Sequence, residues 1–143
     1  MILKLYLDKD IHQKENDMIF EHFAVNVNNV DAVVKWYVSH LELKIASQQK
    51  ELPFMTFLAD SGGRVIMELY QRPDAMMMDF TQQHQLTFHV AFVSENAQED
   101  SNRLQQAGAT FVEEVRKQDG SHLVMLRDPW GLPLQLCERR VKF

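Results

Sequence analysis

The chain has 143 residues, of which 45% are hydrophobic and 24% charged, so it fits one compact globular domain with a sizeable core. Its net charge of −5 gives no electrostatic case for partners such as nucleic acid or an anionic membrane surface. Cys137 is the single cysteine, which excludes an intramolecular disulfide and favours a reducing, cytoplasmic location.

The first 17 residues are predicted to form an N-terminal extension. Residues 1–7 alternate weakly and could add an edge strand, but Lys4 interrupts them and they are too short for a signal peptide or a membrane span. A first module is predicted over 18–70, because apolar residues then alternate as in a strand, recur at helical spacing, and alternate again. Its expected strand, helix and three further strands cover 23–27, 30–41, 43–47, 54–59 and 64–70.

A proline-containing linker, 71–85, separates this module from a second one over 86–138, which a short tail follows. The same order of elements restarts there, with a capping-box spacing at the start of the helix and Gly108 as a left-handed terminator at its end. The predicted fold class is α+β, with two tandem βαβββ modules that form a cupped mixed sheet. The second set of elements is expected at 88–93, 97–108, 111–115, 121–126 and 132–137.

Four polar residues share one repeat register. His89 follows His22 by 67 residues, and Gln135 follows Glu68 by the same number. The same offset lays the strand Phe54–Ala59 over Ser121–Leu126 without a gap. Each of the four polar residues interrupts an apolar strand at the equivalent place in its module.

A histidine on the first strand and a carboxylate or amide on the last indicate half of a metal site in each module. A pseudo-twofold relation between two modules would bring the four side chains together. Imidazole with carboxylate and amide oxygens suits a divalent Zn, Ni, Fe, Mn or Co ion. His22, Glu68 and His89 alone would form a two-histidine, one-carboxylate set, which leaves room for a substrate that offers two oxygens.

The ordered motifs resemble the vicinal oxygen chelate superfamily, which includes glyoxalase I (lactoylglutathione lyase), methylmalonyl-CoA epimerase, extradiol dioxygenases and bleomycin-resistance proteins. The resemblance covers about residues 18–138. Its most specific piece is the Asp-Pro-x-Gly turn with the strand that follows. The matching segments are Glu21–Val25, Trp36–Leu43, Val65–Leu69, Phe88–Phe92, Leu104–Ala109 and Arg127–Leu136.

The resemblance implies a glyoxalase-like fold with a divalent metal held by His22, Glu68, His89 and Gln135. Gln135 departs from the family, which usually has glutamate there, and an amide cannot accept a proton at neutral pH. This departure argues against glyoxalase I itself and leaves Glu68 as the best candidate catalytic base. Glu42 stands where the family often has a glycine, which bears on a turn.

Two classes of function stay open on the sequence. The first is a metal-dependent lyase or isomerase acting on a small α-hydroxycarbonyl, α-ketoacid or thioester-linked substrate, with an extradiol-type dioxygenase as its neighbour. The second is a metal-free protein of bleomycin-resistance type that sequesters an aromatic or planar compound. The family relation also leads us to expect a homodimer, with the four ligands drawn either from one chain or from two.

Three further features have open interpretations. The Met76–Met78 run could line a pliable pocket, form a dimer contact, or be merely an apolar loop. Trp130 in the turn could cover a pocket mouth or meet a second subunit. His122 would share the face of Gln135 if the turn at Asp128 has a two-residue loop, and would face away if the loop has three.

Overall fold

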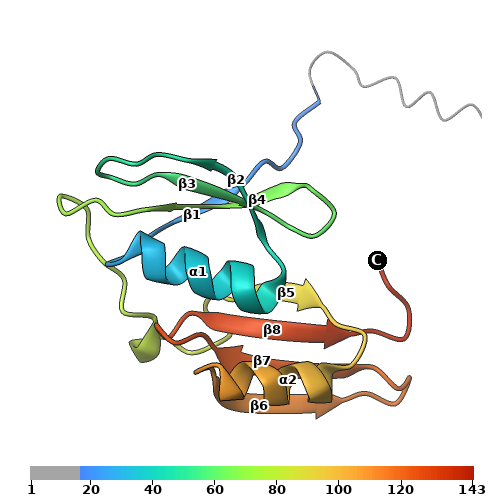
Figure 1. Ribbon diagram of the computed structural model, residues 1–143. Coiled ribbons are helices and arrows are strands. Elements are labelled where there is room, and N and C mark those ends of the chain that lie inside the picture. The colour runs from blue at the N-terminus through green and yellow to red at the C-terminus, as the bar shows by residue number, and fades with distance from the viewer. Residues whose placement is uncertain (1–16) are drawn as a thin grey trace, which may run out of the picture.

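The computed structural model describes residues 17–143, so the expected edge strand at 1–7 and nearly all of the expected extension lie outside the described residues. The described chain forms two α-helices, a short 3₁₀ helix and two four-stranded mixed sheets (Figure 1). In the first module the elements are β1 (Phe23–Asn26), α1 (Val30–Leu41), β2 (Lys44–Gln48), β3 (Thr56–Ala59) and β4 (Val65–Tyr70). Those of the second are β5 (Val90–Val93), α2 (Ala97–Gln106), β6 (Thr110–Arg116), β7 (His122–Arg127) and β8 (Pro133–Glu138), and η1 (Phe80–Gln82) lies in the linker.

Both sheets have the same topology, which confirms the predicted tandem βαβββ fold. The strand orders are β1-β4-β3-β2 and β5-β8-β7-β6, with the first strand of each module parallel to its last. The structure adds that the strands of each module form a separate four-stranded sheet. Within residues 17–143, no helix is long and apolar enough to cross a membrane.

The two helices begin at equivalent asparagines. Asn29 Oδ1 accepts a hydrogen bond from the Ala32 amide, and Asn96 Oδ1 accepts one from the Glu99 amide, each at 3.0 Å. These bonds satisfy amides that a helix start leaves without a partner in the helix. The helix ends differ: Glu42 caps α1 in the left-handed region at φ 57°, whereas Gly108 takes that conformation after α2 at φ 105°.

Strand pairing confirms the repeat register at its two ends. Ala24 pairs with Glu68 on the parallel strands β1 and β4, and Ala91 pairs with Gln135 on β5 and β8. The predicted overlay of the third strands is wrong by one residue, because Glu68 faces Phe57 across the hairpin whereas Gln135 faces Met125. The last pair before the turn is Ala59–Val65 in the first hairpin and Arg127–Pro133 in the second, one residue later on both strands by the repeat. A β-bulge between Leu58 and Ala59 adds one residue to β4, which leaves a difference of one residue at Glu68.

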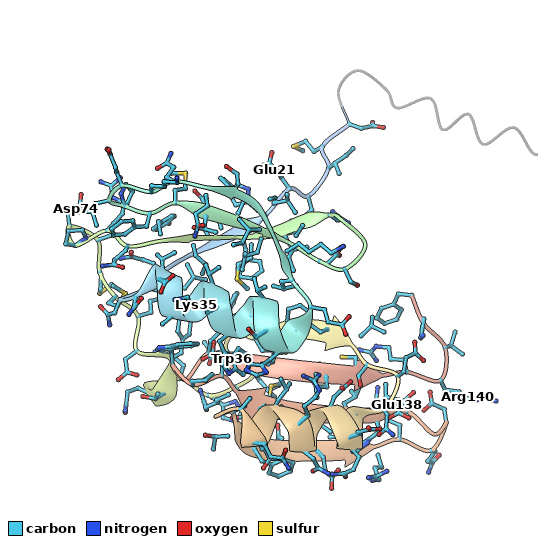
Figure 2. The ribbon with its side chains drawn as sticks, in the orientation of Figure 1. Glu21, Lys35, Trp36, Asp74, Glu138 and Arg140 are labelled. Carbon is cyan, nitrogen blue, oxygen red and sulfur yellow. The ribbon has the colours of Figure 1, made fainter. Side chains whose placement is uncertain are left out.

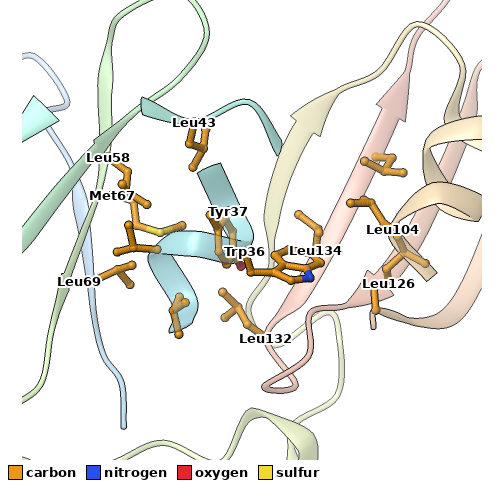
Figure 3. Packing of buried hydrophobic residues seen from close by; sticks show 14 of the residues in the cluster. Trp36, Tyr37, Leu43, Leu58, Met67, Leu69, Leu104, Leu126, Leu132 and Leu134 are labelled. Carbon is orange, nitrogen blue, oxygen red and sulfur yellow. The ribbon is translucent and has the colours of Figure 1, made fainter. Parts of the chain in front are cut away.

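Helix α1 lies between the two sheets and joins the modules into one core. Figure 3 shows Met67 and Leu69 on one side of this helix and Leu132 and Leu134 on the other. Figure 2 shows Trp36 extending from α1 toward the second module, where its indole Nε1 donates to the carbonyl of Ala107 at 2.9 Å. Helix α2 packs on β7 and β8 of its own sheet.

Candidate functional site

The first polar pair lies on the face of the first sheet that α1 leaves uncovered. Met67 and Leu69 face the helix, so Glu68 between them points to the opposite side. His22 directly precedes β1, and its Nε2 lies 3.0 Å from Glu68 Oε2. Its ring also meets Phe57 edge-on, with 5.3 Å between ring centroids. The structure therefore brings His22 and Glu68 together as predicted from the repeat.

A second carboxylate holds the other nitrogen of the same histidine. His22 Nδ1 lies 2.8 Å from Glu21 Oε1, and Figure 2 shows Glu21 on the side of the first sheet away from α1. A neutral imidazole that donates Nδ1–H to Glu21 presents only a lone pair at Nε2, and a lone pair repels the oxygen of Glu68. The close approach therefore requires a shared proton or a cation between Nε2 and Oε2. A divalent cation fits this donor set, because it binds both an imidazole lone pair and a carboxylate oxygen.

The second polar pair occupies equivalent places in the second module. His89 directly precedes β5, and its Nδ1 lies 3.2 Å from the carbonyl oxygen of Gln85. Gln135 on β8 is half-buried, and its Oε1 lies 3.4 Å from Cys137 Sγ, a weak donor. A histidine whose Nδ1–H is held by an oxygen acceptor presents Nε2 as a ligand, which is the usual arrangement around bound metals.

One chain does not bring the two pairs together. Among the described residues, no three His, Cys, Asp or Glu side chains form a group that could hold a metal ion. His22 with Glu68 and His89 with Gln135 are thus two separate polar pairs at equivalent positions on two sheets, which we call half-sites.

His122 faces away from Gln135. The β7–β8 pairing ends at Arg127–Pro133, so the connecting loop is longer than either of the two lengths considered. His122 lies on the α2 side of β7 and is 3% exposed. Its Nε2 contacts Glu114 Oε2 at 2.6 Å and its Nδ1 lies 4.0 Å from Glu138 Oε2. The ring is thus buried and bound to Glu114 through Nε2, on the face of the sheet opposite to Gln135.

Sequence reasoning missed a buried polar pair between the modules. The Tyr37 hydroxyl donates to Asp128 Oδ2 at 2.7 Å, and Asp128 Oδ1 accepts from the amides of Trp130 and Leu132 at 2.9 Å each. Burial raises the pKa of Asp128, although these hydrogen bonds oppose that shift. The Asp-Pro-x-Gly motif revealed the turn, but no local signal indicates that Asp128 reaches a helix of the other module.

Tyr37 and Asp128 also line a cavity of about 350 Å³ on the α1 side of the first sheet. Met77, Met78 and Trp130 line it, so the pocket interpretation agrees with the structure for these three residues, whereas Met76 lies outside the lining.

Comparison with known proteins identifies the family. Residues 19–136 match the sequence profile of the Glyoxalase/Bleomycin resistance protein/Dioxygenase superfamily. The chain belongs to this superfamily. No functionally curated protein sequence matches the chain significantly.

Solved structures of this superfamily share the fold. A glyoxalase family protein from Bacillus cereus is 16% identical with a TM-score of 0.71, and the match covers 86% of this chain and 95% of that one. A lactoylglutathione lyase from Agrobacterium tumefaciens is 19% identical with a TM-score of 0.59, and the match covers 87% of this chain and 95% of that one. An antibiotic-binding protein from a Streptomyces species is 16% identical with a TM-score of 0.64, and the match covers 85% of this chain and 95% of that one. At these identities the likeness shows the fold alone.

Proposed function

We propose that the protein is a divalent-metal-dependent enzyme of lyase or isomerase type. The observation that carries the proposal is the equivalent presentation of two histidines. His22 and His89 both have Nδ1 held by an oxygen acceptor, at 2.8 Å and 3.2 Å, and a metal ion on Nε2 of His22 could also be bound by Glu68 Oε2, which lies 3.0 Å from that nitrogen. Glu68 and Gln135 lie at matching positions on the neighbouring strands and would supply the oxygen ligands.

A homodimer would complete the site. The two half-sites of one chain do not converge within residues 17–143, so each needs an opposing half-site. We propose that His22 and Glu68 of one copy face the second half-site of its partner, and the reverse. A twofold-symmetric dimer would then carry two equivalent sites.

The ligand set fixes the chemical roles of this chain's residues. A bound divalent ion would stabilise negative charge that develops on adjacent oxygens of the substrate. Glu68 is the one carboxylate of the set, so it is the group that would take up a proton, at the Oε2 that faces His22. Gln135 offers an oxygen but cannot take up a proton. A reaction that needs two bases would therefore proceed slowly.

The substrate class follows from an open ligand position and one base. We propose a small α-hydroxycarbonyl, α-ketoacid or thioester-linked compound, bound through adjacent oxygens, with the enzyme in the cytoplasm. The hemithioacetal of methylglyoxal and glutathione is expected to turn over slowly or not at all, because Gln135 replaces the second carboxylate.

Metal titration tests the proposal. Zn²⁺, Ni²⁺, Mn²⁺ and Fe²⁺ are added to metal-free protein, and affinity and thermal midpoint are measured. We expect at least one ion to bind and to raise the midpoint, and His22→Ala or Glu68→Ala to weaken binding by about 100-fold. His84→Ala is the matched control, because His84 is exposed and lies outside both half-sites. Binding that survives both site variants, or wild-type protein that binds none of the ions, would overturn the proposal.

Gln135 favours a second candidate, a metal-free protein that sequesters a planar compound. Without a metal, the paired open sheet faces of a dimer would still form a groove. Absence of metal binding together with micromolar affinity for an aromatic antibiotic would select this function.

A further inference from the structure

The cavity between the modules is separate from the half-sites. Its floor consists of Val33 and Tyr37 from α1 and of Met67 and Leu69 from β4, all at most 4% exposed. Neighbouring residues on a strand point to opposite faces, so a ligand in this cavity would lie across the sheet from Glu68. The site is therefore independent of the metal chemistry proposed above.

The second module and the linker build the rest of the wall. Asp128, Trp130 and Leu132 come from the β7–β8 turn, and Met77 to Phe80 come from the linker. The volume of about 350 Å³ is at the lower end of the range of small-molecule sites. It suits a compact molecule with one ring or two fused rings.

The linker segment over the cavity is fixed at both ends and adaptable between them. On one side, the Asn26 side chain donates to the carbonyls of Arg72 and Ala75, at 3.0 and 3.3 Å. On the other, the Arg127 guanidinium donates to the carbonyl of Phe80 at 2.7 Å. Between these anchors, Met76, Met77 and Met78 precede Asp79, and methionine side chains adapt to the shape of a ligand and contact aromatic rings favourably.

The charged side chains that line the cavity are all negative. It contains the carboxylates of Asp79 and Asp128 and, among residues 17–143, no Lys, Arg or His. No ion pair of the described chain involves either aspartate. Asp128 is only 4% exposed, so it is a buried carboxylate held by hydrogen bonds without a counter-ion. The aromatic rings of Tyr37, Phe80 and Trp130 complete a wall that attracts cations.

We propose that this cavity binds a small organic cation with an aromatic body, of the arylalkylamine class. The ring would lie among Val33, Met67 and Leu69, and the ammonium group would face Asp128 and Asp79. The charge complements the two carboxylates, and the apolar body matches the floor.

Binding of three indoles of similar shape tests the charge requirement. Tryptamine carries a positive charge at pH 7, 3-ethylindole is neutral and indole-3-propionate is negative. Titrations are followed by the methyl signals of ¹³C-labelled methionines. We expect tryptamine to bind about tenfold more tightly than 3-ethylindole, with indole-3-propionate weaker still, and to shift the signals of Met67, Met77 and Met78.

Matched variants locate the site. Met78→Lys places a cation at the edge of the cavity and should weaken tryptamine binding at least tenfold. Met76→Lys makes the same change at an exposed residue outside the lining and should alter the affinity less than twofold. Asp79→Asn keeps an acceptor for the start of η1 and should weaken tryptamine binding but not 3-ethylindole binding. His22→Ala should leave tryptamine binding unchanged, which separates this site from the metal half-site.

Three results would overturn the proposal. The first is equal affinity for tryptamine and 3-ethylindole, and the second is tryptamine binding that His22→Ala abolishes. The third is a Met78→Lys variant that weakens self-association while tryptamine shifts no methionine signal. That result would assign the cavity edge to a subunit contact.

Discussion

Individual residues of the two half-sites illustrate what sequence can predict about chemistry. The histidines, Glu68 and Gln135 were found because each polar residue interrupts an apolar strand at a repeated position. Glu21 was not assigned a role, because an exposed glutamate beside a strand resembles any surface charge. Its contact with His22 Nδ1 appears only once β1 and its preceding residues are placed in space.

Glu42 provides a residue-scale prediction about stability. It adopts φ 57° at the end of α1, a conformation that strains every residue with a Cβ and suits glycine. We expect Glu42→Gly to raise the free energy of unfolding by about 0.5 to 1 kcal/mol, since relief of strain exceeds the entropy that glycine adds to the unfolded chain. Glu42→Ala, which keeps the Cβ, is the control and should give no gain. Urea denaturation measures both, and equal stability of the glycine and alanine variants would show that φ is not the cause.

Elements were predicted well where local signals coincide. Asparagine caps and apolar spacing gave both helices, and alternation gave the strands. The β-bulge in the first hairpin escaped prediction because a bulge changes pairing without changing composition. The packing of η1 on the β7–β8 turn was not predicted either, because no sequence pattern relates the linker to this turn.

Gly131 tests this element contact. It has φ 92°, and a Cβ added there would lie 2.4 Å from Thr81 Cγ2 and 3.2 Å from the Thr81 amide nitrogen. Gly120 has a similar φ of 93°, but an added Cβ would meet nothing within 4 Å. Both alanine variants place a Cβ on a residue with positive φ, so the difference between their stabilities measures the contact with Thr81. We expect Gly131→Ala to be less stable than Gly120→Ala by about 1 to 3 kcal/mol. Equal losses in thermal unfolding would mean that η1 does not pack on this turn.

The whole molecule depends on contacts between modules that were not predicted. Tyr37 and Asp128 lie 91 residues apart, and each has a sufficient local explanation, one as a core residue and the other as a turn residue. Whether two half-sites meet within a chain or across a dimer also depends on module packing, which the repeat does not specify.

The burial of Asp128 predicts a pH dependence of stability. Burial raises the folded-state pKa of Asp128 above its ordinary value of 3.8, so the folded protein binds this proton more tightly than the unfolded chain does. The stability from this group is fully present below pH 3.8 and is lost as the pH rises through the folded-state pKa. Subtracting the stability of Asp128→Asn from that of the wild type across the acid range should give a difference that falls with rising pH. A flat or rising difference would contradict this assignment.

The joining of two half-sites across a dimer is tested most directly by complementation. One variant carries His22→Ala with Glu68→Ala, and the other carries His89→Ala with Gln135→Ala. The two are co-expressed with different tags, heterodimers are purified, and bound divalent metal is measured after saturation and desalting. We expect neither variant alone to retain metal and the heterodimer to retain one ion, at the site where its two intact halves meet. A heterodimer without metal, beside wild-type protein that binds it, would contradict a site shared between chains.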